Sequence, residues 1–224
     1  MQAVQVVAGP MAVASANGIV TIINKPANGY LTLNGGLVVS GVAKLTTPRR
    51  VLFTLDANET GTTFTVTGTD ANSNVQSETI TGIDASGVTK TQYSVLDYLT
   101  VTSIKVYNAG GAAAGNVTVG TNTIGGSRWV RLNDFAPSNI SIQVDVSGTI
   151  NYTVQATLDD PNDPFNPVTP QNVVWVSSSD LAVVGANSTQ QSNFLFTPKY
   201  AKILINSGTG TATATFLQSS NGPR

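Results

Sequence analysis

The sequence contains no cysteine and no histidine. Without cysteine the chain can form no disulfide, no thiolate metal site and no cysteine nucleophile. Without histidine it lacks the commonest general base and the commonest neutral metal ligand. These two absences exclude most of the usual catalytic and metal-binding arrangements. We therefore expect a protein that is not an enzyme, with no catalytic residues, no cofactor site and no tightly bound metal.

Charge is also scarce. Only 10% of the 224 residues are charged, against about a quarter in an average soluble protein. The formal net charge is -1, so the surface offers no electrostatic attraction for nucleic acid or for an anionic membrane. The first ten residues lack the basic segment and the apolar core of a signal peptide. No apolar run reaches the roughly 18 residues that a membrane helix needs. We expect neither nucleic acid nor membrane as a partner.

The clearest pattern in the chain is an alternation of apolar and polar residues over positions 139–158. Period-2 alternation is typical of a β-strand with one buried and one wet face. Ser147 and Gly148 interrupt the alternation, and Gly tolerates the positive φ that tight turns need. We therefore predict an antiparallel hairpin. The inward residues that should share one core are Ile142, Val144, Tyr152 and Val154.

Other segments show the same kind of pattern. Residues 62–68 and 75–82 predict a hairpin around the turn formers at 70–74, and residues 201–206 and 211–218 predict another around 207–210. Residues 173–176 are interpreted as a buried strand, and residues 89–95 as irregular or a short helix. No segment has helical periodicity over more than about two turns. The fold class that follows is all-β, with two antiparallel β-sandwich-like domains in tandem.

The small, polar stretch at residues 121–128 is the best domain boundary. It divides the chain into an N-terminal β domain at 1–125 and a C-terminal β-sandwich domain at 126–224. Residues 2–8 form either a docked strand or an arm that orders on a partner. Both this segment and residues 211–218 are expected to be free sheet edges. We expect residues 2–8 to lie against another subunit, and removal of residues 1–10 to leave the fold intact but to impair incorporation into particles.

The densest cluster of oxygen ligands is the loop containing Asp159, Asp160, Asn162 and Asp163. Such side chains suit Ca²⁺, but the spacing is not that of an EF-hand loop. The alternative is a proline-stiffened turn whose Asp and Asn side chains cap their own backbone. We favour the turn, and weak Ca²⁺ binding at the three carboxylates stays open. Asp70, Asn72 and Asn74 form a similar set of oxygen ligands, and we interpret them in the same way as a hairpin turn.

Enzymatic motifs are missing as well. No Gly-x-Ser-x-Gly elbow and no Gly-x-x-x-x-Gly-Lys-Ser/Thr loop occurs, and both are signatures of specific active sites. A pair of carboxylates suffices for a glycosidase, but no acidic residue stands in an aromatic strip. Trp129 and Trp175 are candidate platforms for sugar stacking. Both adjoin valine-rich runs, which favours packing in a core or at a domain interface.

Two long segments resemble structural proteins of tailed bacteriophages. The first is Thr-Thr-Phe-Thr-Val-Thr-Gly-Thr-Asp-Ala-Asn-Ser-Asn-Val-Gln-Ser-Glu-Thr-Ile-Thr-Gly at residues 62–82, continued by the strands at 101–106 and 114–120. The second runs from Trp-Val-Arg-Leu at 129–132, through residues 146–155, to Leu-Asp-Asp-Pro at 158–161. Together the two cover residues 50–217. The resemblance implies a virion protein that assembles with other virion proteins, and it implies no catalytic residue.

Two classes of function remain. The first is a non-enzymatic virion structural protein, homo-oligomeric in the particle and in contact with portal, adaptor, tail or capsid subunits. Its expected place is the head–tail or tail-fibre attachment region, with a capsid decoration or cement protein as the alternative. The second class is a carbohydrate-binding module of a tail fibre or surface protein. It requires an aromatic strip flanked by Asn, Asp or Arg. Only 7% of residues are aromatic and they are scattered, which favours the first class.

Overall fold

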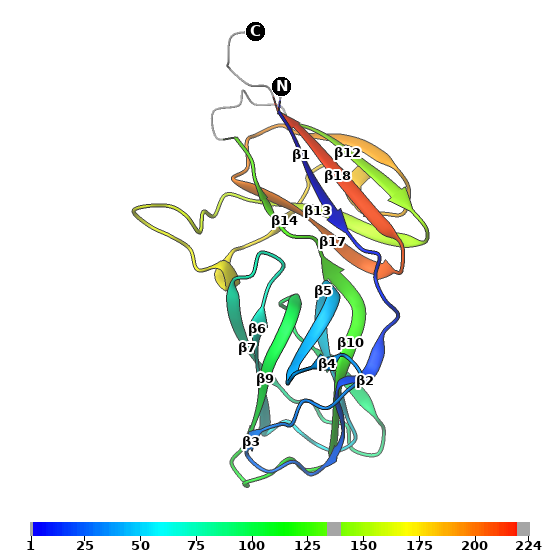
Figure 1. Ribbon diagram of the computed structural model, residues 1–224, viewed down its shortest axis with the longest axis vertical. Coiled ribbons are helices and arrows are strands. Elements are labelled where there is room, and N and C mark those ends of the chain that lie inside the picture. Colours follow the sequence, from blue (N-terminus) through cyan, green and yellow to red (C-terminus); the bar gives the residue numbers. More distant parts are fainter. Residues whose placement is uncertain (1, 134–139, 219–224) are drawn as a thin grey trace. The chain divides into compact units, whose positions relative to one another are not determined.

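A computed structural model describes residues 2–133 and 140–218 of the chain (Figure 1). In these residues the chain forms antiparallel strands, labelled β1 to β18, and two three-residue 3-10 turns, with no α-helix. The all-β antiparallel fold class is therefore confirmed. None of the helical turns in this part of the chain is long or apolar enough to cross a membrane.

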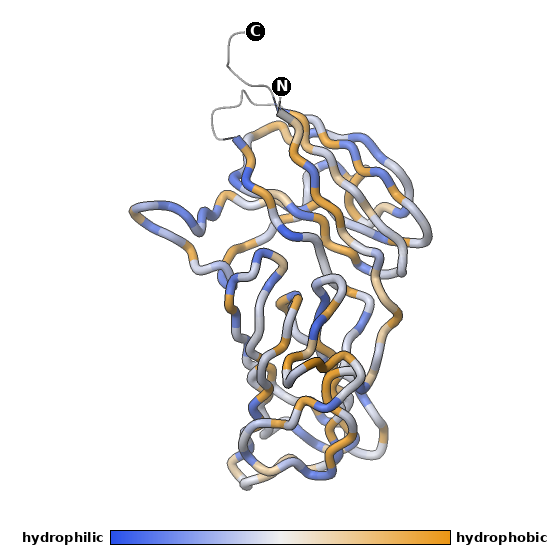
Figure 2. Tube along the Cα trace, in the orientation of Figure 1, coloured by the Kyte–Doolittle hydropathy of each residue, from blue (hydrophilic) through white to orange (hydrophobic). Residues whose placement is uncertain are grey.

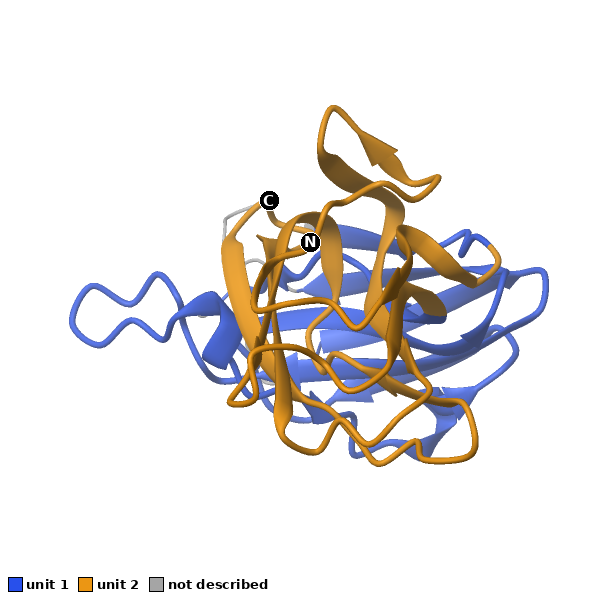
Figure 3. Cartoon of the chain, turned by 90° about the horizontal axis from the view of Figure 1, so that it is seen from below, with its two compact units in different colours: residues 1–12, 123–224 blue, residues 13–122 orange. Residues whose placement is uncertain are grey.

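The chain divides into two compact units (Figure 3). Unit 1 comprises residues 1–12 and 123–224, and unit 2 comprises residues 13–122. The predicted N-terminal domain contained all of residues 1–125, whereas the structure joins the first twelve residues to the second half of the chain. The units are thus nested in the sequence, because unit 2 is inserted between two segments of unit 1.

Unit 1 is a sandwich of two layers. Its first layer is a four-stranded sheet in the order β1-β18-β12-β16. The bounds are β1 (Gln2–Ala8), β12 (Ile140–Ser147), β16 (Gln190–Phe194) and β18 (Thr211–Gln218). Its second layer consists of β13 (Ile150–Thr157) and β17 (Tyr200–Gly208) with the short strands β11 (Val130–Arg131), β14 (Val176–Ser177) and β15 (Val184–Ala186). The 3-10 turns are η1 (Pro170–Asn172) and η2 (Leu181–Val183).

The core of unit 1 lies between these two layers. Alternate residues of each strand point inward, and the alternation of hydropathy can be followed along the strands in Figure 2. Ile142 and Val144 of β12 and Tyr152 and Val154 of β13 are all buried in this one core. The prediction about these four side chains is confirmed. Burial of such side chains stabilises the fold by about 1.5–3 kcal/mol each.

The predicted pairing of these strands is wrong. β12 pairs with β16 and β18, while β13 pairs with β17, so the turn at Gly148 connects the two layers and does not close a hairpin. The turn between β17 and β18 makes the same crossing. Backbone N–H groups of Thr209 and Gly210 donate to Thr149 O at 3.0 and 2.8 Å and hold the two turns together. Gly148 and Gly208 take positive φ values of 78° and 98° there, which glycine adopts most readily.

Strand β1 is an integral part of unit 1. It pairs with β18 over its whole length, from Gln2 opposite Gln218 to Ala8 opposite Ala212. Val6 and Ala8 are fully buried in the sandwich core. Removal of residues 1–10 would take this strand and two core side chains out of unit 1, which argues against the expectation that the fold would stay intact. The expectation of a free edge at residues 211–218 is wrong, since β18 lies between β1 and β12.

Unit 2 is built around the strand order β10-β5-β9-β6-β7. The bounds are β5 (Val42–Leu55), β6 (Thr62–Thr69), β7 (Val75–Thr81), β9 (Tyr98–Asn108) and β10 (Asn116–Gly126). Around them lie β2 (Ser15–Asn24), β3 (Gly29–Tyr30), β4 (Val38–Val39) and β8 (Lys90–Tyr93). Strand β10 continues past residue 122 into unit 1, where Gly125 and Gly126 pair with β17.

Two expectations concern unit 2. The hairpin of β6 and β7 is confirmed, with a ladder from Thr63 opposite Thr81 to Thr69 opposite Val75. Residues 90–93, by contrast, form strand β8 against β5 and are neither irregular nor helical. Inward residues such as Phe64 and Val66 of β6 are fully buried in a core of their own.

Candidate functional site

In the acidic loop of unit 1, the carboxylates of Asp159, Asp160 and Asp163 accept hydrogen bonds from nearby backbone N–H groups. Asp159 Oδ2 accepts a hydrogen bond from Val174 N at 2.7 Å, and Asp160 Oδ1 accepts one from Asn162 N at 2.8 Å. Asp163 Oδ1 accepts two, from Phe165 N at 2.8 Å and from Asn166 N at 2.9 Å. The two N–H groups lower the pKa of Asp163. No group of three or more acidic side chains placed to hold a metal occurs in the described part of the chain. The geometry is that of a capped turn.

The turn of the β6–β7 hairpin is built in the same way. Asp70 Oδ1 accepts from Asn72 N and from Asn74 N, both at 2.8 Å, and Asp70 Oδ2 accepts from the Asn74 amide. The side chain thus replaces backbone partners that the reversal of the chain leaves open. Like the loop at residues 159–163, this set caps a turn.

The two tryptophans meet in unit 1, which the sequence did not reveal. The ring centroids of Trp129 and Trp175 are 6.2 Å apart, and those of Trp129 and Tyr200 are 4.8 Å apart, both edge to face. The Lys202 ammonium lies 4.5 Å from the centre of the Trp175 ring. Edge-to-face contact and a cation over a ring are favourable packing geometries for aromatic side chains.

Polar groups of the kind found in sugar sites surround this aromatic cluster. The Tyr200 hydroxyl donates to Asp160 Oδ1 at 3.0 Å and accepts from Asn162 Nδ2 at 2.8 Å. Arg131 Nη2 lies 3.5 Å from Asp160 Oδ2. Burial raises the pKa of Tyr200. These groups bind one another and the rings meet at their edges, so the arrangement acts as packing that fixes the acidic loop to β17.

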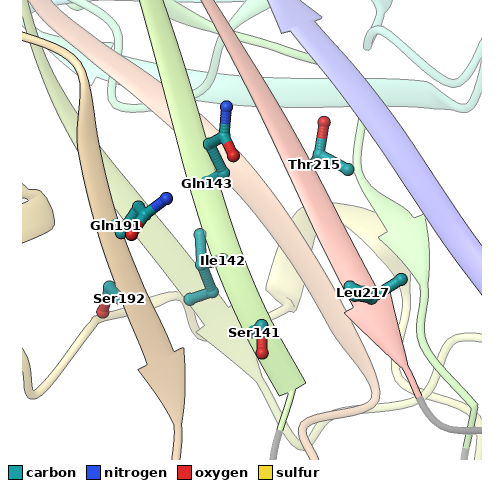
Figure 4. A pocket seen from close by; sticks show the side chains of 7 residues that line it. All are labelled: Ser141, Ile142, Gln143, Gln191, Ser192, Thr215 and Leu217. Atoms are coloured by element: carbon teal, nitrogen blue, oxygen red, sulfur yellow. The ribbon is translucent and has the colours of Figure 1, made fainter.

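A shallow groove of mixed polar and apolar lining, which includes Ile142 and Leu217, runs over the four-stranded sheet (Figure 4). It encloses about 390 Å³ and crosses β16, β12 and β18. One row of paired residues spans the whole sheet, with Gln5 opposite Thr215, Thr215 opposite Gln143, and Gln143 opposite Gln191. No aromatic or positively charged side chain lines the groove. Its amide and hydroxyl groups can exchange hydrogen bonds with water or with a neutral polar surface.

A second groove in unit 1 is apolar. It encloses about 210 Å³ between the end of β13, strand β14 and the segment after β16, and its lining includes Leu158, Val176, Phe194 and Phe196. Leu158, Val176 and Phe196 are 68%, 63% and 47% exposed. Strand β14 stands at the end of its strand order and pairs with β13. An exposed apolar surface beside a sheet edge is typical of protein–protein contact sites.

Part of this apolar groove differs from what the sequence predicts. Residues 173–176 were expected to form a buried strand, but only Val173 is buried, while Val174 and Val176 are exposed. Leu195 and Phe196 were not singled out at all. Residues 173–176 and 194–196 are both consecutive apolar residues without alternation. Such a run does not predict which of its side chains face a core.

Unit 2 encloses two charged side chains that also escaped sequence analysis. Glu59 is fully buried and accepts hydrogen bonds from Gly115 N at 2.7 Å and from the Thr62 hydroxyl. Arg49 is buried as well, and its guanidinium reaches the hydroxyls of Thr121 and Thr46. Burial lowers the pKa of Arg49. These contacts join separate loops and strands of one unit, and they are structural.

Comparison with known proteins adds little to this geometry. No known family model matches the chain, and no curated protein matches it. Among solved structures it is similar to the major capsid protein P2 from bacteriophage PM2, with 7% sequence identity over 100% of both chains and a TM-score of 0.18. A similarity of that size carries no argument about fold or function. The class that the structure itself defines is an all-β protein of two antiparallel units.

Proposed function

We propose that this chain is a non-enzymatic structural protein of a tailed-bacteriophage particle, and that it acts through the protein–protein interfaces it makes. The observation that carries the proposal is the apolar groove beside β14, with Leu158, Val176 and Phe196 exposed around it. The resemblance of residues 50–217 to virion proteins supports the particle as the setting.

The apolar groove favours a protein partner for a physical reason. Apolar area removed from water contributes about 25 cal/mol per Å², so covering these side chains favours association. A neutral surface adds no repulsion between copies packed at high local concentration. The partners in this proposal are other virion proteins, such as portal, adaptor, tail or capsid subunits, together with further copies of the chain.

The proposed place is the head–tail or tail-fibre attachment region. The test is mass spectrometry of extensively washed particles from the phage that encodes the chain, followed by cryo-electron microscopy of the same particles. Density for both units at the neck or at the base of a fibre would support this place. Regular density over the capsid lattice would instead make the chain a decoration protein. Absence of the chain from washed particles would overturn the virion proposal.

A variant tests the groove itself. Phe196→Asp places a charge in the groove, and we expect it to lower occupancy on particles assembled without the chain by about tenfold, since an unpaired buried charge costs well over 1.4 kcal/mol. Leu181→Asp is the matched control, because Leu181 is 79% exposed and lies outside the groove lining. Equal occupancy by both variants would show that the groove is not the contact surface.

A carbohydrate-binding module is the second candidate. The observation in its favour is that Trp129, Trp175 and Tyr200 lie together beside Asn162 and Asp160. The test is a glycan array probed with the wild-type chain and with Trp175→Ala, with Tyr107→Ala, an exposed aromatic residue of unit 2, as control. Glycan binding that only the Trp175 variant loses would favour this function over the structural one.

A further inference from the structure

Strand β1 lies at one end of the four-stranded sheet of unit 1. Within the described residues it pairs with β18 alone, and no described strand pairs with its other side. Its sequence, Gln-Ala-Val-Gln-Val-Val-Ala, contains no charge and no proline. Sheet edges in soluble proteins are usually protected by charged residues, prolines, bulges or covering loops. None of the first three occurs in β1, whose ladder with β18 runs without a register shift.

The opposite end of the same sheet is different. There β16 contacts the segment that leads into η2, and the Ser192 hydroxyl donates to Asp180 Oδ2 at 2.8 Å. Strand β16 is also shorter, with five residues against seven in β1. The longest exposed edge of this sheet is therefore β1, and an extended strand is the kind of partner that it fits.

The order of residues in β1 identifies that partner. We propose that a second copy of this chain pairs its own β1 antiparallel to the first, around a twofold axis that passes beside Gln5. In that register Gln5 faces Gln5 of the second copy, Val4 faces Val6, and Ala3 faces Val7. Residues that face each other in this register lie on the same side of the sheet. Val4 and Val6 lie on the core side, and Ala3, Gln5 and Val7 lie on the side exposed to water.

The chemistry of the facing residues favours this pairing. Val7 is half exposed and Val4 is only partly buried in the single chain, and a second strand would cover both. Side chains directly opposite each other on paired strands approach to about 5 Å, so the two Gln5 amides can donate to and accept from one another. No charge is buried and no like charges meet. A foreign strand could use the same edge, but a second copy is favoured because it sets apolar residues opposite apolar residues and glutamine opposite glutamine, with no charge in the contact.

The contact deepens the proposed structural function by naming a second copy as partner, and its test uses the purified full-length chain alone. The wild-type chain should form dimers with rising concentration in analytical ultracentrifugation. Gln5→Glu and Gln5→Lys each place like charges opposite each other across the twofold axis, which destabilises the pair. Each variant alone should need about tenfold more protein for the same dimer fraction, equal to about 1.4 kcal/mol. An equimolar mixture of the two variants should restore wild-type association, because opposite charges then meet.

The controls separate this contact from other association. Gln143→Glu and Gln143→Lys alter the same sheet face two strands away from the edge, and neither should change the dimer fraction. A wild-type chain that stays monomeric at all concentrations would overturn the proposal. So would dimers that the Gln5 variants leave unchanged, since the interface would then lie elsewhere. Neither result would bear on whether the chain is found in washed particles, so the two proposals fail separately.

Discussion

The edge strands β1 and β7 are both seven residues long, but their side chains make different contacts with the rest of the chain. In unit 2, side chains of β7 bind the segment at residues 95–97 of the same unit. Glu78 of β7 accepts hydrogen bonds from Val95 N at 2.8 Å and Leu96 N at 2.9 Å, and Gln76 Nε2 donates to Asp97 O at 2.7 Å. In unit 1 no comparable side chain of β1 holds such a segment within the described residues.

The two edge strands therefore have the same length but differ in the polar side chains that bind a neighbouring segment. Arg50 also contacts this segment in unit 2, because its Nε lies 3.7 Å from Asp97 Oδ1. In β1, Gln5 Nε2 donates to Thr215 Oγ1 of the neighbouring strand at 3.3 Å. Strand β7 is thus bound through its side chains to residues 95–97, whereas the described residues show no such segment bound to β1.

The largest expected effect comes from Val144→Asp, which disrupts the core of unit 1 that also buries Val6 and Ala8 of β1. Val144 is fully buried in unit 1, and an unpaired carboxylate there costs several kcal/mol. Hydrogen exchange measured by mass spectrometry should show loss of protection in β1, β12 and β18, while β6 and β7 stay protected. Equal loss in both units would contradict the division of the chain into two compact units.

Glu59→Leu is the next largest change and acts on unit 2 alone. It leaves Gly115 N and the Thr62 hydroxyl without their buried acceptor, at a cost of about 3 kcal/mol for a group that binds a buried charge. Denaturant unfolding should show a lower midpoint for the transition of unit 2. Glu59→Gln keeps an acceptor oxygen and should cost less. An unchanged midpoint for the leucine variant would show that the network is dispensable.

Glu78→Ala tests whether the segment at residues 95–97 protects the edge of β7. Loss of the hydrogen bonds to Val95 N and Leu96 N should cost about 1–2 kcal/mol, discounted for partial exposure. Amides of residues 94–97 should exchange faster, and the chain should self-associate more than wild type in light scattering. Thr79→Ala, on the exposed face of the same strand, is the control. If only stability changed and association did not, the segment at residues 95–97 would not be what protects this edge.

A smaller effect concerns acid. Hydrogen bonds from Ala182 N and from Ser192 lower the pKa of Asp180 below its ordinary value of 3.8. A carboxyl with a lowered folded-state pKa stabilises the fold above its unfolded-state pKa, and this contribution is lost as the pH falls through the folded-state pKa. The Ala182 amide resonance should therefore shift in acid, below the ordinary pKa, in nuclear magnetic resonance spectra. Asp180→Asn should abolish that shift, and its persistence would assign the effect to another group.

Sequence alone determined where most strands lie and which side of each faces inward. Alternation over β12 and β13 placed Ile142 and Tyr152 in one core, and alternation over β6 did the same for Phe64. The β6–β7 hairpin was predictable because Asp70 and its neighbours form a turn locally. Such features depend on the geometry of a few consecutive residues, in which side chains point to opposite faces in turn.

Only the tertiary structure decided which strands pair. A hairpin and a turn that crosses between two layers bury the same alternate residues, so alternation cannot distinguish them, and β12 and β13 proved to lie in different layers. Strand β1 lies beside β18, and the paired residues Gln2 and Gln218 are more than 200 positions apart in the sequence. This pairing, like the contact of Trp129 with Trp175, depends on the packing of whole layers. These contacts minimise exposed apolar area over the folded unit, and no local stretch of sequence contains that information.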